Sequence, residues 1–140
     1  MRKNMGLYRG KRKDNGEWVE GNLFENDNGN YPMVLIGHVV MSRDKHTNEL
    51  SFDGFGLWEV DPDTVGQFTG LTDKNGVKIF EGDILTIGKC KSHPAFVAMD
   101  NFSWECLMKV FPTWRHRLEP TPMKYEIIGN IHDNPELLEV

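Results

Sequence analysis

The sequence predicts an all-β protein, made mainly of strands with one short helical turn at its carboxyl end. Apolar runs are short and turn signals separate them roughly every eight to twelve residues, as in barrels and sandwiches. No segment keeps apolar residues at helical spacing beyond about two turns. An Asn-Gly pair, which is typical of tight turns, occurs twice, at Asn15-Gly16 and again at Asn75-Gly76. These observations favour a small barrel or sandwich of about eight or nine strands with a duplicated hairpin element.

The duplicated turn makes a specific structural prediction. Asn-Gly is favoured in two-residue type I′ hairpins, because both central residues of that turn need a positive φ. Each copy leads on to an acidic-glycine corner, Glu20-Gly21 in the first and Glu81-Gly82 in the second. We therefore expect two structurally equivalent hairpins with positive φ at Asn15, Gly16, Asn75 and Gly76.

The amino-terminal elements follow from alternation and turn residues. Leu7 to Lys11 and Glu17 to Phe24 are expected to form the two arms of the first hairpin. A turn over Asn26 to Asn30 leads into Tyr31 to Met41, where uninterrupted apolar character indicates a strand covered on both faces. A polar loop, Ser42 to Glu49, ends this part of the chain.

The middle of the chain continues in the same way. Gly56 to Val60 is expected to be a short strand, and Asp61 then caps a helical turn that Pro62 begins, since proline lacks the N–H that would be unpaired there. The second turn copy ends at the Gly82-Asp83 corner, which feeds a strand over Ile84 to Ile87.

The last elements are a hairpin, a strand and a helical turn. Ala95 to Met99 and Trp104 to Val110 are expected to pair across Asp100-Asn101, and Lys124 to Ile131 forms the final strand. In Asn134-Pro135-Glu136-Leu137-Leu138, Asn134 is expected to cap a short helical turn that docks through Leu137, Leu138 or both.

Length and composition limit the class of protein. The 140 residues fit a single domain, 1–140, or two lobes that share a core at about 1–60 and 61–140. Two cysteines are too few for a disulfide framework, and no apolar segment follows the basic start as in a signal peptide. The longest apolar run, Met33 to Met41, is far shorter than the roughly twenty residues of a membrane helix. We expect a cytoplasmic protein without a membrane partner.

Signatures of catalysis and of cofactor binding are missing from the sequence. No Gly-Lys-Ser/Thr phosphate loop or Gly-x-Ser-x-Gly elbow occurs, and Gly54-Phe55-Gly56 lacks the third glycine of a dinucleotide site. Asp61 with Asp63, and His132 with Asp133, could pair as acid and base, but capping and structural hydrogen bonds explain them better. We predict that the protein is not an enzyme and holds no cofactor.

One set of residues has the chemistry of a zinc site but not its usual spacing. Zinc ligands come in two closely spaced pairs, and here only the first pair has that spacing. We therefore expect no metal, and the sequence leaves open whether the four side chains converge. They are Cys90, His93, Cys106 and His116.

The amino-terminal hairpin is basic although the net charge of the chain is −5. Residues 2–13 hold six basic side chains and no acid, a pattern that usually marks a solvated face. Aromatic side chains among basic ones could instead form a stacking platform for single-stranded nucleic acid, which the acidic total opposes. The candidate binding patch consists of Tyr8, Arg9, Lys11, Arg12, Lys13 and Trp18.

Three stretches of the chain together resemble the YopX family of small phage and prophage proteins. They are Arg9 to Val19 with Gly21, Val60 to Ile84, and Ile128 to Leu138, in the family's order. The resemblance implies a β-rich fold and a phage or prophage origin, and it supplies no catalytic residues. The corner at Glu81 to Leu85 is also similar to strand openings in SH3-like barrels, which favours such a barrel for one lobe.

The predicted function is association with other proteins. Small β domains with unpaired strand edges and exposed aromatic side chains commonly bury them in partners. We expect a non-enzymatic accessory protein that binds copies of itself, as a homo-oligomer, or a host factor. The alternative is a nucleic-acid-binding module that uses the basic amino-terminal hairpin.

Overall fold

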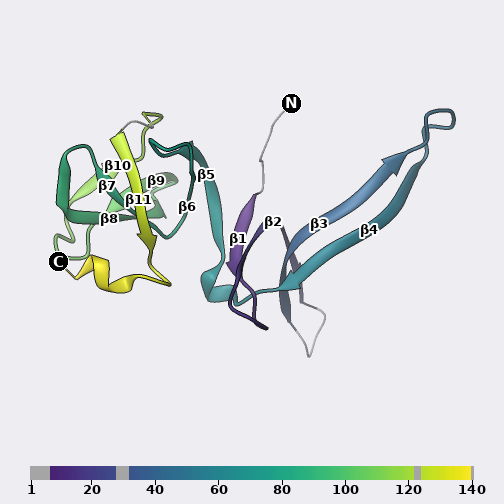
Figure 1. Ribbon diagram of the computed structural model, residues 1–140, viewed down its shortest axis with the longest axis horizontal. Helices are drawn as coiled ribbons and strands as arrows, with labels where there is room; N and C mark the ends of the chain where they lie inside the picture. Colours follow the sequence, from purple (N-terminus) through teal and green to yellow (C-terminus); the bar gives the residue numbers. More distant parts are fainter. Residues whose placement is uncertain (1–6, 28–31, 122–123, 140) are drawn as a thin grey trace. The chain divides into compact units, whose positions relative to one another are not determined.

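A computed structural model of the chain describes residues 7–27, 32–121 and 124–139. Eleven strands and the short 3-10 helices η1 and η3 occupy this part of the chain, so the all-β class is confirmed (Figure 1). The sheets are antiparallel and open, with no closed barrel among the described strands. No described helix has the length and apolar character needed to cross a membrane.

The chain divides into two compact units, residues 1–65 and 66–140. The predicted core shared between two lobes stays a prediction. Unit 1 holds four antiparallel strands in the order β4-β3-β2-β1, followed by η1. They are β1 (Tyr8–Lys11), β2 (Trp18–Asn26), β3 (Met33–Arg43), β4 (Leu50–Glu59) and η1 (Pro62–Thr64).

The core of unit 1 lies on one face of its sheet. Ile36 and Val60 are fully buried there, and Gly10 lies against both, so that a Cβ at Gly10 would be 3.0 Å from Cδ1 of Ile36. Arg12 forms an isolated antiparallel bridge with Val60, and the Lys13 N–H donates to the carbonyl of Glu59 at 3.0 Å. The end of β1 therefore lies beside the end of β4.

Unit 2 contains a two-stranded pair, β5 with β6, and a five-stranded sheet in the order β10-β9-β8-β7-β11. The buried side chains Ile79, Leu85, Val97 and Tyr125 belong to one apolar cluster. The elements are β5 (Gly66–Thr72), β6 (Lys78–Phe80), β7 (Asp83–Ile87), β8 (Cys90–Asp100), β9 (Ser103–Leu107), β10 (Arg115–Arg117), β11 (Tyr125–Asn130) and η3 (Pro135–Leu138).

The prediction of two type I′ Asn-Gly turns is wrong. Gly16 and Gly76 have φ of 72° and 77°, but neither Asn15 nor Asn75 has a positive φ. The reason is loop length. In the second copy, the Asp73 N–H donates to the Val77 carbonyl, which leaves three loop residues and needs only one left-handed position.

The first copy is one residue longer, so the two turns are not equivalent. There the Arg12 N–H donates to the Glu17 carbonyl at 2.9 Å, which leaves four loop residues, and Asn15 Oδ1 accepts from the Glu17 N–H. A two-residue turn with both φ values positive occurs instead between β8 and β9, at Asn101 (51°) and Phe102 (63°).

Both predicted helical turns form, but only one is capped as expected. Asp61 Oδ1 accepts from the Asp63 N–H at 3.0 Å, which confirms the cap of η1. Leu138 of η3 is buried, as predicted for the docked tail. Asn134 makes no side-chain cap, because its Oδ1 faces back toward β11 and accepts from the Asn130 N–H at 3.2 Å.

Candidate functional site

The predicted basic patch is divided between the two faces of the β1–β2 hairpin. Lys11 pairs with Trp18 and Tyr8 pairs with Gly21, and since side chains alternate along a strand, Tyr8 lies on the face opposite to Lys11 and Trp18. The Arg9 guanidinium lies 4.8 Å from the ring centroid of Trp18, and the Lys11 ammonium lies 5.7 Å from it. Three of the six candidate residues therefore form one cation–π cluster.

Local acids offset the charge of two other patch residues. Arg12 donates through both Nε and Nη2 to the Asp14 carboxylate, at 2.9 and 2.6 Å, and this pairing raises the pKa of Arg12 and lowers the pKa of Asp14. Lys13 Nζ lies 3.1 Å from the Glu59 carboxylate. Phosphate groups would have to compete with these carboxylates, so the structure favours the solvated-face interpretation for Arg12 and Lys13.

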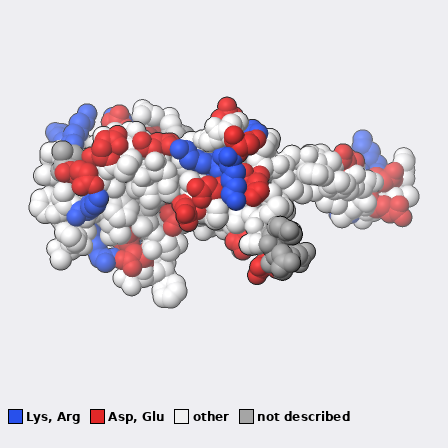
Figure 2. Space-filling view, turned by 90° about the horizontal axis from the view of Figure 1, so that it is seen from below, with Lys and Arg blue, Asp and Glu red and all other residues white. Residues whose placement is uncertain are grey.

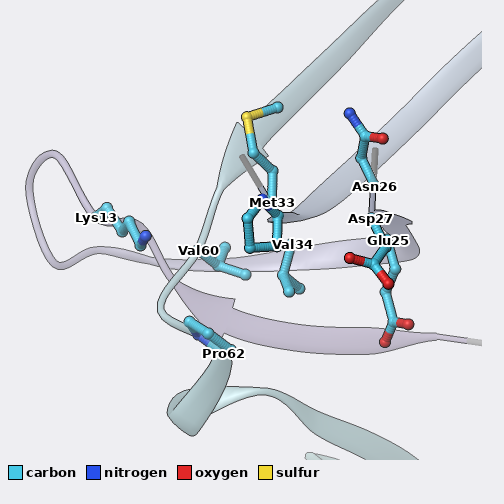
Figure 3. Close-up of a pocket in the computed structure, with 9 residues that line it drawn as sticks. Lys13, Glu25, Asn26, Asp27, Met33, Val34, Val60 and Pro62 are labelled. Atoms are coloured by element: carbon cyan, nitrogen blue, oxygen red, sulfur yellow. The ribbon is translucent and has the colours of Figure 1, made fainter. Parts of the chain in front are cut away.

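A hollow of about 370 Å³ lies in unit 1 (Figure 3). Figure 3 shows Lys13 at one side of it and the acids Glu25 and Asp27 at the other, separated by apolar side chains. A general acid–base pair must share one reacting group, and these charged groups do not converge on one. The apolar floor is made by Met33, Val34, Val60 and Pro62.

Among the described side chains of the possible zinc set, His93, Cys106 and His116 do not gather to hold a metal ion. Cys106 and His116 face each other across β9 and β10, and burial raises the pKa of the Cys106 thiol to about 12. His93 instead packs edge-on against Phe111, with 5.1 Å between ring centroids. The side chain of Cys90 lies outside the described part of the chain. Within that part, no three His, Cys, Asp or Glu side chains are placed to hold a metal ion.

One carboxylate of each remaining candidate acid–base pair makes a hydrogen bond within a turn. Asn130 Oδ1 accepts from the N–H groups of His132 and Asp133, and Asn130 Nδ2 donates to the Asp133 carboxylate. Asp61 caps η1. The carboxylates of Asp61 and Asp133 therefore make hydrogen bonds within their own turns.

An exposed apolar surface that the sequence did not predict lies along β3 and β4. Strand β3 pairs with β2 only as far as Gly37, opposite Asn22, and beyond it β3 and β4 continue as a two-stranded ribbon (Figure 1). We call this ribbon, His38 to Arg43 with Leu50 to Gly56, the β3–β4 arm. Its exposed apolar side chains are Val39, Val40, Met41, Leu50, Phe52 and Phe55.

The arm corrects the sequence-based account of this region. Tyr31 itself lies outside the described residues, and the prediction that the strand to Met41 is covered on both faces is wrong for Val39 to Met41, which are exposed. The strand at Gly56 to Val60 begins earlier, at Leu50. A run of apolar residues in a strand signals burial only when another layer exists to cover it, and the sequence carries no direct signal of that layer.

Charges gather at the end of the arm rather than along it. In Figure 2 the projecting ribbon is white for most of its length and carries acidic and basic side chains near its tip. The tip is an ordered turn, in which Asp44 Oδ1 accepts from the N–H groups of His46 and Thr47 at 2.7 and 2.8 Å. The arm is thus an apolar surface with a polar end.

Comparisons with known proteins found a similar solved structure and a matching protein family. The crystal structure of protein EF1440 from Enterococcus faecalis is similar, with a TM-score of 0.54 and 28% sequence identity, over 94% of this chain and 96% of that one. None of the curated proteins compared matches the chain. The sequence model of the YopX family, described as "YopX protein", matches residues 7–139. Because this match spans nearly the whole sequence, the chain belongs to the YopX family.

Proposed function

We propose that this YopX-family chain is a non-enzymatic accessory protein of phage or prophage origin that acts in the bacterial cytoplasm by associating with other proteins. The observation that carries the proposal is the β3–β4 arm, where large apolar side chains of both strands are exposed. Contiguous exposed apolar surface is rare on monomeric proteins and marks interaction sites.

A protein partner is favoured because exposure of the apolar side chains of the β3–β4 arm to water costs free energy. A two-stranded ribbon in water is only marginally stable, because it has no second layer to bury its apolar side chains. Burial of one exposed Phe or Leu is worth roughly 1.5 to 3 kcal/mol. A protein partner on the arm would both order the ribbon and remove these side chains from water.

The nucleic-acid alternative rests on the Arg9, Lys11 and Trp18 cluster. Cationic and aromatic groups together are the elements of single-strand binding. Against it stand the acid partners of Arg12 and Lys13 and the net charge of −5. Protein association is therefore the better supported function.

The two functions are separated by one pair of measurements on the full chain. Tagged wild-type protein and a Phe55→Ser variant are used to capture proteins, including untagged copies of the chain, from bacterial cells that carry the phage. We expect capture by wild type, reduced in the variant and insensitive to nuclease.

Filter binding to single-stranded DNA and RNA at low and moderate salt is the second measurement. Binding through phosphate contacts falls steeply as salt rises. Tight, salt-sensitive binding together with nuclease-sensitive capture would establish the alternative, and the absence of any captured protein would refute the proposal.

A further inference from the structure

We propose that two copies of this chain associate by stacking the apolar faces of their β3–β4 arms against each other. This inference rests on the proposed function and names its partner and its surface. The observations that lead to it are the register of the arm, a bulge within it and the distribution of its charges.

The register separates the arm into an apolar and a polar face. Residues directly opposite in an antiparallel pair share a face, and successive residues alternate. Val39 pairs with Phe55, Met41 with Phe52 and Arg43 with Leu50, so these six residues line one face. His38, Val40 and Ser42, with their partners Gly56, Gly54 and Ser51, line the other.

A β-bulge places both phenylalanine rings on the apolar face. Phe52 and Phe55 are three residues apart, and in a regular strand they would point to opposite faces. The pairing shifts between Val40 and Met41, which absorbs one residue of β4, and the two rings stack with centroids 6.1 Å apart. Bulges re-aim side chains in this way.

The same bulge keeps an acid away from the apolar face. The Asp53 carboxylate accepts a hydrogen bond from the Ser42 hydroxyl at 3.2 Å, which places Asp53 on the polar side of the ribbon. The local backbone thus sorts two aromatic residues from the charged residue between them. This sorting is what an interface requires, because charged residues are depleted at interface cores.

The exposed area suits a pair of faces. Phe52 and Phe55 are 60% and 65% exposed, and for aromatic side chains of about 150–250 Å² this amounts to roughly 190–310 Å². Val39, Met41 and Leu50 raise the face to about 500 Å², so two stacked faces would bury at most about 1,000 Å², which reaches the size expected of a specific interface.

Charge explains why a second copy fits this face. Between Leu57 and Phe52 the face carries no charged side chain, so two identical faces can meet without like-charge repulsion although each chain carries −5. Arg43, at the outer end, donates to the carbonyl and side-chain oxygens of Asn48 in its own tip, at 2.9 and 3.1 Å. A two-fold axis through the face would bring the same side chains of both copies to the centre and close the assembly.

Light scattering on size-exclusion fractions of the full chain tests the proposal. The test variants are Phe55→Ser and Phe52→Ser, and the matched control is Val40→Ser. Val40 lies on the same arm and is 55% exposed, but it lies on the opposite face. We expect wild type and Val40→Ser to be dimers, and each Phe variant to raise the dimer dissociation constant at least about 30-fold.

Because both rings are exposed, the Phe variants should keep the fold, and circular dichroism with thermal unfolding verifies this. Hydrogen exchange supplies a readout that does not depend on a variant: arm amides of wild type should gain protection as concentration rises. A monomeric wild type without this gain, or equal dissociation by Val40→Ser and Phe55→Ser, would overturn the proposal.

Failure of this inference is distinguishable from failure of the proposed function. If the wild type is monomeric but captures another protein that Phe55→Ser does not, the association function stands and the second copy is wrong. If it neither dimerises nor captures a protein, both proposals are wrong.

Discussion

Replacement of Asp73 by alanine should be among the most damaging single changes in unit 2. Asp73 is 2% exposed and follows β5 at the start of the second turn copy. Its Oδ1 accepts from the N–H groups of Asn75 and Val77, both at 2.9 Å, and its Oδ2 accepts from the Ile127 N–H of β11 at 3.2 Å. One carboxylate therefore holds the turn closed and ties it to the last strand.

The magnitude follows from these three hydrogen bonds. A hydrogen bond to a charged group contributes about 1.5–3 kcal/mol, and a buried donor that loses its acceptor costs a similar amount. The exposed Asn75 and Val77 can recover water, whereas the half-buried Ile127 has less access to it. We expect Asp73→Ala to lower the free energy of unfolding by about 3 kcal/mol, or roughly 10 °C in melting temperature. Asp73→Asn keeps one acceptor oxygen and should lose about half as much.

Urea unfolding, followed by circular dichroism at pH 7, measures both variants against wild type. Asp14→Ala is the matched control, because Asp14 lies in the first turn copy, is exposed and bonds only within its own turn. It should change stability by less than about 0.5 kcal/mol. If Asp73→Ala stays within that limit, or if Asp14→Ala costs as much as Asp73→Ala, the account of the second turn is wrong.

Three further changes test other parts of the structure. Phe102 is fully exposed at positive φ, where a residue with a β-carbon costs about 1–2 kcal/mol. Phe102→Gly should therefore stabilise the protein by up to about 1 kcal/mol, while Phe102→Ala should not. A loss of stability on thermal unfolding of the glycine variant would contradict this. Lys74 Nζ, 2.8 Å from the Glu126 carboxylate, holds the pKa of Glu126 below its ordinary 4.5. The ion pair thus adds stability above pH 4.5, and this stability is lost as pH falls through the lowered pKa. Glu126→Gln should therefore be less stable than wild type at neutral pH and equally stable near pH ~2. A difference in stability that persists in acid would refute the ion-pair explanation. With a pKa of about 12, a fraction of only about 10⁻⁴ of the Cys106 thiol should be ionised at pH 8. In a Cys90→Ser variant, Cys106 should therefore react with a thiol reagent only after denaturation. Rapid labelling of the native variant would contradict this by showing that Cys106 is accessible.

The sequence predicted a structural feature correctly where the residues that determine it are close together in the chain. Asp61 and Pro62 specify the start of η1, since the cap and the preset φ act within one turn. The hairpin at Asp100 to Ser103 was located correctly because both strands flank it directly. The all-β class followed for the same reason, from short apolar runs and frequent turn residues.

Features that depend on distant partners were missed or misplaced. Strand β10, Arg115–Arg117, is short and polar and is a strand only because β9 offers it an edge. The Asn-Gly turns took other forms because the backbone hydrogen bonds that close them leave four loop residues in the first copy and three in the second. The basic patch was identified by composition, yet the pairing of Lys13 with Glu59, far along the chain, decides how much of its charge remains available.

The sequence by itself determined the β class, the approximate position of most strands along the chain and the chemistry of each side chain, because backbone preference and alternation act over a few residues. Only the tertiary structure decided which apolar residues are covered. Val39 and Ile36 are both β-branched and lie on one strand, but Ile36 is buried in the core of unit 1 and Val39 lies on the exposed arm. Burial depends on which other parts of the fold cover a residue. The arm is exposed because β2 does not pair with β3 beyond Gly37, and the sequence carries no signal of where that pairing ends.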